Sequence, residues 1–327
     1  MKILLTHTPH MRDNYYGARA LKGLQLLGEV KLHQGAETLE GDALIAAAQG
    51  SDLIVADRAT AVPALIFERL SSLRAVLRCA VDIRNIDVTA ASAHGILVTR
   101  AKPGFVESVT ELVLGLLVDL NRGISRASAA YQAGGMPTAQ MGRQLSGTTI
   151  GIIGYGAIGR NVAPLAAHLG MRVLIADPHV RVEDSRFCQV DLPTLLAEAD
   201  HVVCLAVANE ATENLIDAEA LARMRRDAVF INVSRGNLVD EAALAAAIAE
   251  GRIAGAAIDV GRAPDQMPSP AIARLKGVIA TPHIGGLTPP AIEAQALHTV
   301  EQVRALVSGA VPDGAVNAAS WTRRIAG

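Results

Sequence analysis

Three residues with chemically useful side chains directly follow short apolar runs of the sequence. They are Arg235 in INVSRG, Asp259 in GAAIDVG and His283 in IATPHIGG. A guanidinium can hold a carboxylate and a carbonyl in a bidentate fork. An imidazole can take up and return a hydroxyl proton near neutral pH, and a nearby carboxylate can fix an amide. If they meet, these side chains predict acid–base chemistry on a small carboxylic acid.

Each of these residues also has a purely structural alternative. Arg235 could cap the turn that follows it, and Asp259 could cap a helix or a turn. A lone histidine is more often structural, but His283 is followed by two glycines in a segment suited to close approach. We expect the remaining histidines to be surface or packing residues: His7, His10, His33, His94, His168, His179, His201 and His298.

A glycine-rich turn predicts a binding site for the cofactor that such chemistry needs. The segment TIGIIGYGAIGRNVAPLAAHLGMRVLIAD contains Gly154, Gly156 and Gly159 in the spacing G-x-G-x-x-G. A strand before these glycines and a helix after them would form a dinucleotide site, with the pyrophosphate at the helix N-terminus. Asp177 closes the next predicted strand, where a carboxylate accepts both ribose hydroxyls and repels a 2′-phosphate. We therefore expect NAD rather than NADP, and read Arg181 as a surface charge.

The predicted cofactor contacts come from the loops that follow the strands of this second half. They are Gly154, Tyr155, Gly156, Ala157, Ile158, Gly159, Asp177, Pro178, Leu205, Ala206, Val233, Ser234, Arg235, Asp259, His283 and Gly285. Such loops meet at one edge of a doubly wound sheet, so these residues can gather around one ligand.

The elements that must position these residues alternate between strand and helix in two blocks. The first block, residues 2–99, has five predicted strands and no glycine fingerprint. The second begins at Thr149. Between them we expect a helix over 108–121 that is apolar nearly all round and buried, then a surface connector over 122–147. The predicted class is α/β: two doubly wound parallel-sheet domains, Rossmann or flavodoxin-like, with an interdomain cleft.

Composition excludes several classes of protein. Of the 327 residues, 50% are hydrophobic and 3% aromatic, and the formal net charge is −2, so we expect no nucleic-acid partner. Cys79, Cys188 and Cys204 are scattered in apolar surroundings and read as reduced core thiols. No His/Cys cluster suggests a metal. The N-terminus lacks a signal peptide's apolar region, and no window suits a membrane span, so we expect a soluble cytoplasmic protein.

The order of these motifs resembles the D-isomer-specific 2-hydroxyacid dehydrogenase family, which includes phosphoglycerate, glycerate/hydroxypyruvate and D-lactate dehydrogenases. GYGAIG, Asp177, NVSRG, AIDV and TPHIGG carry the resemblance, together with NID, SVTELVLGLL and GRQLSGTTIGIIG. The resemblance covers nearly the whole chain. It implies NAD(H), a homodimer, and a split substrate domain over 1–101 plus 287–327 around an NAD-binding domain over 102–286.

The resemblance also assigns roles by position. Arg235 would anchor the substrate carboxylate and polarise its carbonyl, and His283 would be the acid/base. Asp259 would contact the nicotinamide carboxamide. The function implied is transfer of a hydride between nicotinamide and C2 of a D-2-hydroxy or 2-oxo acid.

One departure from the family pattern lies after Asp259. Relatives read D-V-F-x-x-E-P, and their glutamate pairs with the histidine. Here Pro264 occupies the glutamate position, and Asp265 replaces it only if the loop shifts by one residue. Without a carboxylate neighbour we expect the base His283 to titrate lower than in relatives, or catalysis to be weak. A pH profile of kcat/KM whose basic limb lies above about pH 7.5 would contradict the first option.

A second departure lies in the loop where relatives offer backbone amides to the substrate. The loop Val81-Asp82-Ile83-Arg84 carries an aspartate that would repel a carboxylate unless Arg84 compensates or Asp82 points away. We expect Val81, Asp82, Arg84, Phe105 and Arg235 to bind the substrate, although Phe105 could instead belong to the core. These departures leave two alternatives: an NAD(H)-sensing interaction protein with little turnover, or a dehydrogenase for an atypical substrate.

Overall fold

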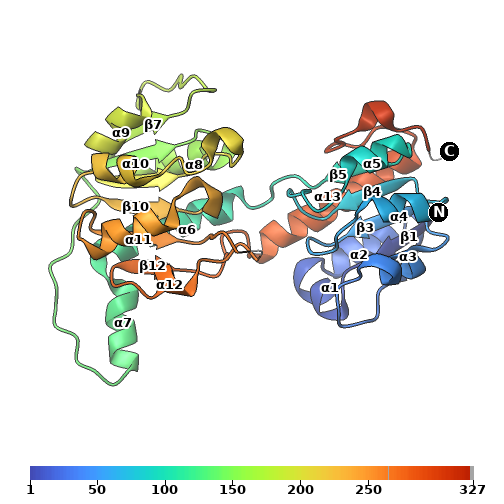
Figure 1. Ribbon diagram of the computed structural model, residues 1–327, viewed down its shortest axis with the longest axis horizontal. Coiled ribbons are helices and arrows are strands. Elements are labelled where there is room, and N and C mark those ends of the chain that lie inside the picture. The colour runs from blue at the N-terminus through green and yellow to red at the C-terminus, as the bar shows by residue number, and fades with distance from the viewer. Residues whose placement is uncertain (264, 325–327) are drawn as a thin grey trace. The chain divides into compact units, whose positions relative to one another are not determined.

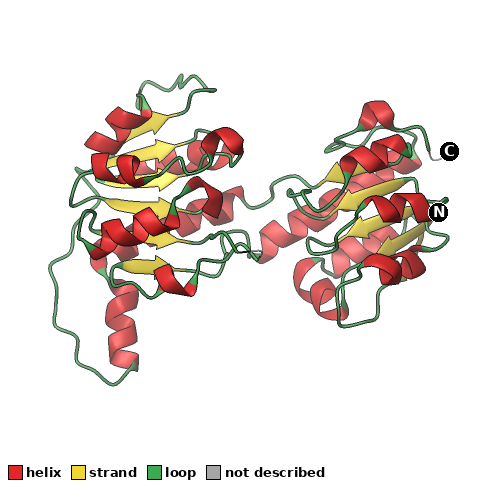
Figure 2. Cartoon of the chain, in the orientation of Figure 1, coloured by secondary structure: helices red, strands yellow, loops and turns green. Residues whose placement is uncertain are grey.

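The structure is a computed structural model that describes residues 1–263 and 265–324 (Figure 1). It divides into two compact units. Unit 1 comprises Met1–Phe105 and the segment from Thr288 onward, and unit 2 comprises Val106–Leu287. Each unit has one parallel sheet with helices packed on it (Figure 2). The predicted class of two parallel-sheet α/β domains is confirmed.

Unit 1 holds a five-stranded parallel sheet in the order β2-β1-β3-β4-β5, which is flavodoxin-like. Its strands are β1 Lys2–Leu5, β2 Glu29–Leu32, β3 Leu53–Ala56, β4 Ala75–Arg78 and β5 Leu97–Arg100. One face is covered by α2 Ala18–Gln25 and α13 Pro289–Val307, and the other by α3 Gly41–Ala48, α4 Ala64–Arg69 and α5 Val88–Ala93. Every residue of β3 (LIVA) is buried, as expected for a strand covered on both faces.

Unit 2 holds a seven-stranded parallel sheet in the order β12-β11-β10-β9-β6-β7-β8. Its strands are β6 Thr149–Ile153, β7 Arg172–Ala176, β8 Cys188–Gln189, β9 His201–Cys204, β10 Val229–Asn232, β11 Gly255–Ile258 and β12 Val278–Ala280. Its helices are α6 Val106–Arg122, α7 Ile124–Gln132, α8 Ala157–His168, α9 Leu192–Glu198, α10 Ala218–Arg223, α11 Glu241–Ala249 and α12 Pro270–Ala273. The strand order reverses between β6 and β9, where doubly wound sheets bind ligands.

Several elements differ from the sequence-based expectations. The helix α1, Pro9–Tyr15, was not expected, although Thr8 caps it and Pro9 begins it. The connector contains the nine-residue helix α7, which has no buried residue and extends away from the sheet of unit 2 (Figure 1). The helix α6 buries one face rather than its whole surface, since Val118 is 38% exposed. Cys188 is exposed, so its assignment to the core is wrong.

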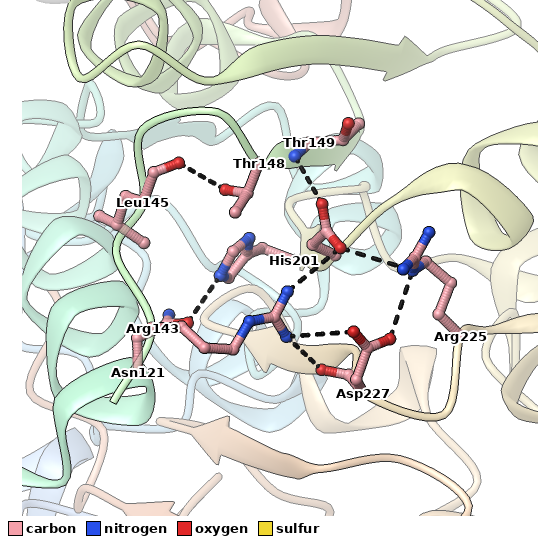
Figure 3. Close-up of polar contacts among 9 residues, drawn as sticks. Asn121, Arg143, Leu145, Thr148, Thr149, His201, Arg225 and Asp227 are labelled. Atoms are coloured by element: carbon pink, nitrogen blue, oxygen red, sulfur yellow. Dashed lines mark hydrogen bonds and ion pairs between the residues drawn. The ribbon is translucent and has the colours of Figure 1, made fainter. Parts of the chain in front are cut away.

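A polar cluster fixes the point where the connector returns to the sheet of unit 2. Arg143 Nη2 donates to Asp200 Oδ1 (3.2 Å), and Asp200 Oδ2 accepts the backbone N–H of Thr149 (2.7 Å). Beside them, Nε2 of the fully buried His201 lies 3.1 Å from Asn121 Oδ1 (Figure 3). Burial lowers the pKa of His201. The cluster lies at the amino ends of β6 and β9, opposite the edge where ligands bind, so it anchors the connector.

The buried His7 of unit 1 makes stability depend on pH. Burial lowers the pKa of His7 from 6.5 to about 4, while the charges of Asp57, Arg12 and Arg78 act in both directions. Between these pH values His7 is protonated in the unfolded chain but not in the folded chain, so stability falls as pH falls from 6.5 toward 4. Between about pH 7 and about pH 5 this group should remove roughly 2 kcal/mol.

Urea unfolding of wild-type protein and of His7→Gln at both pH values measures this term. The difference in unfolding free energy between the two proteins should change by that amount, because other titrating groups cancel. An equal pH response in both proteins would show that His7 accepts a proton in the folded state.

Candidate active site

The predicted residues of unit 2 all follow strands at the carboxyl edge of its sheet. Gly154–Gly159 follow β6, Asp177 and Pro178 follow β7, and Leu205 and Ala206 follow β9. Val233, Ser234 and Arg235 follow β10, Asp259 follows β11, and the segment from Thr281 to Gly285 follows β12. These strands are neighbours in the sheet. The structure thus brings the candidate residues of this unit to one edge.

The glycine turn after β6 has the form that a dinucleotide phosphate requires. Gly154 has φ +96°, and a Cβ there would lie 2.8 Å from the backbone of Leu205 and Ala206. A Cβ on Gly159 would lie 2.4 Å from the carbonyl oxygen of Gly154. Gly156 faces open space and caps α8 without a side-chain hydrogen bond. The first-turn amides of a twelve-residue helix are therefore available to a pyrophosphate.

Asp177 is fixed beside that turn by backbone donors. Its Oδ2 accepts the N–H of Tyr155 (2.7 Å), and its Oδ1 accepts those of His179 (2.8 Å) and Val180 (3.2 Å). Gln189, which sequence reasoning missed, donates to the carbonyl oxygens of Asp177 and Val180. The carboxylate thus has one orientation at the end of β7, and its charge disfavours a 2′-phosphate.

A turn built by Asn232 presents Arg235 after β10. The buried Asn232 accepts the N–H of Ser234 (3.1 Å) and donates to the carbonyl oxygen of Arg235 (2.9 Å). Ser234 Oγ donates to Ala206 O (2.7 Å), which links this turn to the loop after β9. Arg235 Nη1 donates to Ser234 O (2.7 Å). Arg235 is the N-cap residue of the short turn Gly236–Leu238, without a side-chain cap hydrogen bond. Its contact with a substrate carboxylate stays a prediction.

Asp259 organises the loop that carries His283. Its buried carboxylate accepts the Thr281 hydroxyl (2.7 Å) and the backbone N–H groups of Ile284 and Gly285 (both 2.8 Å). These contacts are those of a turn cap, the alternative left open by the sequence. The predicted contact of Asp259 with a nicotinamide carboxamide stays a prediction.

His283 itself has an unusual backbone. Its φ is +55°, a left-handed conformation that is uncommon for residues other than glycine. Strained backbone persists only where the surroundings impose it, and it gathers at functional sites. Here the amides of the next two residues, Ile284 and Gly285, donate to the Asp259 carboxylate and hold the backbone of the turn. The turn thus places His283 at the end of β12.

The loop after β11 bears on the missing glutamate. Pro264, which occupies the glutamate position, lies outside the described residues. Asp265 is exposed, and its Oδ1 accepts the N–H of Met267 (2.9 Å). The Gly261 backbone packs closely on this loop, since a Cβ there would lie 2.0 Å from Met267 O. Whether Asp265 serves as a catalytic carboxylate stays a prediction.

The predicted substrate loop of unit 1 carries a compensated charge. Arg84 Nε lies 3.0 Å from Asp82 Oδ1 and its Nη2 lies 2.6 Å from Asp82 Oδ2, so the two side chains form a bidentate ion pair. The pair offsets the repulsion that Asp82 alone would exert on a carboxylate. Val81 precedes the pair and is half-buried. Phe105 is half-buried at the end of the first segment of unit 1 and is not among the core residues.

Two absences concern only the described residues. No group of three or more His, Cys, Asp or Glu side chains in 1–263 and 265–324 could hold a metal ion. Within the same residues no helix is long and apolar enough to cross a membrane.

The family model for the D-isomer specific 2-hydroxyacid dehydrogenase NAD binding domain matches residues 114–285. (S)-sulfolactate dehydrogenase of Chromohalobacter salexigens is 37% identical over 80% of this chain and 86% of its own length. D-3-phosphoglycerate dehydrogenase of Methanocaldococcus jannaschii is 32% identical over 97% of this chain, which spans 59% of that relative. The crystal structure of a Thermus thermophilus protein has a TM-score of 0.86 at 29% identity and covers 97% of this chain and 100% of its own. This chain belongs to the D-isomer specific 2-hydroxyacid dehydrogenase family, and its cofactor is NAD.

Proposed function

We propose that the chain interconverts a 2-oxo acid and the corresponding D-2-hydroxy acid with NAD(H). The observation that carries the proposal is the place of His283 in a left-handed turn, which Asp259 holds through the amides of the next two residues, at the sheet edge that carries the glycine turn. When bound there, the nicotinamide would supply or remove the hydride at C2. A sensor of NAD(H) would need the glycine turn but no imidazole in this turn.

The chain's own residues handle the carboxylate and the proton. Arg235 binds the acid's carboxylate through its planar fork of N–H donors and stabilises the negative charge that develops on the carbonyl oxygen. His283 gives a proton to that oxygen during reduction and takes it back during oxidation. Val81, Asp82, Arg84 and Phe105 of unit 1 remain the predicted contacts of the acid in that unit.

The names of the relatives are consistent with one stereochemical class. In sulfolactate the sulfur-bearing carbon outranks the carboxyl carbon, so the (S) descriptor denotes the arrangement that is D in lactate. Sulfolactate and 3-phosphoglycerate both carry a second anion on C3. In this chain the cation Arg84 of the substrate loop is already paired with Asp82. We propose that a C3 anion is not required for turnover.

The test is NADH oxidation against a panel of 2-oxo acids. The panel pairs pyruvate, hydroxypyruvate and glyoxylate with sulfopyruvate and 3-phosphohydroxypyruvate, and includes hydroxyacetone as an oxo compound without a 2-carboxylate. Turnover of one or more acids, with a D-configured product wherever the product is chiral, supports the dehydrogenase. Tight NADH binding without turnover of any acid would contradict it and favour the sensor. Turnover confined to an oxo compound without a 2-carboxylate would favour the atypical-substrate alternative.

We also propose that the chain works as a cytoplasmic homodimer. The arm formed by α7 and the following loop exposes large apolar side chains: Ile124, Tyr131, Met136 and Met141. Their exposed fractions reach 100% at Met141, which is unusual for a surface without a partner. Sedimentation of wild-type protein and of a Tyr131→Asp, Met136→Asp variant checks the dimer.

The cytoplasmic location is proposed on the cysteines. Burial raises the pKa of the Cys79 and Cys204 thiols to about 12, which suits reduced core cysteines.

The preference for NAD should depend on the charge of Asp177. Asp177→Asn keeps an acceptor for the turn amides but removes the carboxylate that repels a 2′-phosphate. Loss of a charged hydrogen-bond acceptor is worth about 1.5–3 kcal/mol. We therefore expect the ratio of kcat/KM for NADH over NADPH to fall by roughly 10–100-fold, at about 1.4 kcal/mol per tenfold. Asp184→Asn, which removes a half-buried carboxylate of the same unit that is paired with Arg186, is the control and should leave the ratio unchanged.

A further inference from the structure

Arg78 is a fully buried arginine at the carboxyl end of β4 in unit 1. Its side chain has no exposed surface, although it ends in a charged group. Burial lowers the pKa of Arg78 to about 10, so the guanidinium stays charged at neutral pH. A charged side chain in a core needs an explanation, because apolar residues of similar volume usually fill the same space at a lower cost in free energy.

The guanidinium joins two loops at the carboxyl edge of the sheet. Nη1 donates to the carbonyl oxygen of Asp57, and Nη2 donates to the carbonyl oxygen of Thr60 (2.9 Å). Nη2 also donates to Asn85 Oδ1 (2.5 Å). The first two acceptors lie in the loop after β3, and the third ends the predicted substrate loop. Arg78 thus bridges the loop after β3 and the loop after β4.

Asn85 completes the bridge. Its Nδ2 lies 3.2 Å from Arg58 O and 3.3 Å from Ala59 O, so its amide group accepts from Arg78 and donates to the loop after β3. The backbone continues the connection, since Val62 N donates to Asn85 O (2.8 Å). The two loops are therefore held to each other immediately after the residues Val81–Arg84.

The loop after β3 is itself anchored. The Asp57 carboxylate accepts the hydroxyls of Thr6 (2.6 Å) and Thr60 (2.5 Å), and its Oδ1 accepts the N–H of Ala59 (2.8 Å). Because Thr6 follows β1, the ends of three strands share one buried network. Arg78 is the charged side chain that links this network to Asn85. Its Nε has no hydrogen-bond partner among the described residues, so the site is not optimised for stability.

We infer that Arg78 is a positioning residue that holds the loop Val81–Arg84 in the conformation that binds the 2-oxo acid, a role that rests on the proposed function. The guanidinium touches neither acid nor cofactor and acts through Asn85 and the loop after β3. Displacement of a substrate contact by about 1 Å can lose about 10²-fold in rate. Loss of the bridge should therefore act on the acid and leave NADH binding in unit 2 unchanged.

Two variants test the inference without depending on one fold-sensitive change. Arg78→Lys keeps the charge but cannot span three acceptors. Asn85→Ala removes the link from an exposed residue and spares the buried network. The control is Arg74→Met, which removes an arginine just before β4, at the opposite edge of the sheet. For each protein we would measure KM and kcat for the acid, the NADH dissociation constant, and amide exchange at Val62 and Ile86.

Both variants should raise the KM of the acid by about 10–100-fold, speed exchange at the two amides, and leave the NADH dissociation constant within about twofold of wild type. Arg74→Met should change none of these. Unchanged KM in both variants of an active enzyme would overturn the inference while the proposed function stands. A wild-type protein that turns over no acid would overturn the proposed function, and unchanged amide exchange would overturn the loop-holding role without reference to activity.

Discussion

Replacing His283 with asparagine should lower kcat for reduction of the preferred 2-oxo acid by about 10²–10⁴-fold, the usual contribution of a general acid. Asparagine is chosen because it tolerates the left-handed backbone that His283 adopts at φ +55°. The side chain stays polar and keeps a hydrogen-bond donor. It cannot give up a proton to the carbonyl oxygen as the hydride arrives, so the step that His283 assists is slowed while substrate binding is largely kept.

The measurement is steady-state kinetics with NADH and the acid, accompanied by NADH binding and thermal unfolding. His168→Asn is a suitable control, because His168 is an exposed histidine at the end of α8 in the same unit. NADH affinity and melting temperature should stay near wild type in both variants. If His283→Asn keeps more than a tenth of the wild-type kcat at neutral pH, the acid/base role is assigned to the wrong residue.

Asp259 shows where a sequence pattern reaches its limit. The pattern AIDV places a carboxylate at the end of β11, and the structure agrees. The carboxylate's partners are the amides of Ile284 and Gly285, which are 25 and 26 residues further along the chain. No local rule relates an aspartate to amides at that distance. The sequence therefore supplied the residue and left its two possible roles open.

Strand ends were the most predictable part of the fold. Runs such as LIVA in β3 are buried on both faces, so their composition alone predicts a covered strand. The glycine turn was equally accessible, because its G-x-G-x-x-G spacing is a local pattern, and Gly159 is required by a close contact with the carbonyl oxygen of Gly154 in the same turn. The class of each sheet, and the edge where the candidate residues gather, follow from these local signals.

The elements that were missed have weak local signals or depend on distant partners. The helix α7 has only two large apolar residues, Ile124 and Tyr131, and both are exposed, so its apolar pattern is weak. Arg78 stands in the apolar run AVLR, and nothing local reveals that its guanidinium reaches Thr60 and Asn85. The same holds for Arg143, whose acceptor Asp200 precedes β9. Buried polar bridges between loops are tertiary facts, and a single sequence does not encode them in its spacing.

Replacing Arg235 should have the second large effect, on both binding and rate. A guanidinium that grips a carboxylate in two parallel hydrogen bonds adds energy and geometry that a lysine cannot reproduce. Each charged hydrogen bond is worth about 1.5–3 kcal/mol. We expect Arg235→Gln to lose about 10³-fold in kcat/KM for the acid and Arg235→Lys about 10²-fold, at roughly 1.4 kcal/mol per tenfold.

The division of that loss between kcat and KM tests whether Arg235 also polarises the carbonyl. If Arg235 only anchors the carboxylate, KM rises and kcat is unchanged, because ground state and transition state lose the same contact. If it also polarises the carbonyl, kcat falls as well, because charge grows on that oxygen as the hydride arrives. Arg226→Gln, at an exposed arginine of the same unit, controls for loss of charge. Since Asn232 and Ser234 fix the turn through backbone and hydroxyl groups, the Arg235 variants should keep it, and a fall in kcat then reports polarisation.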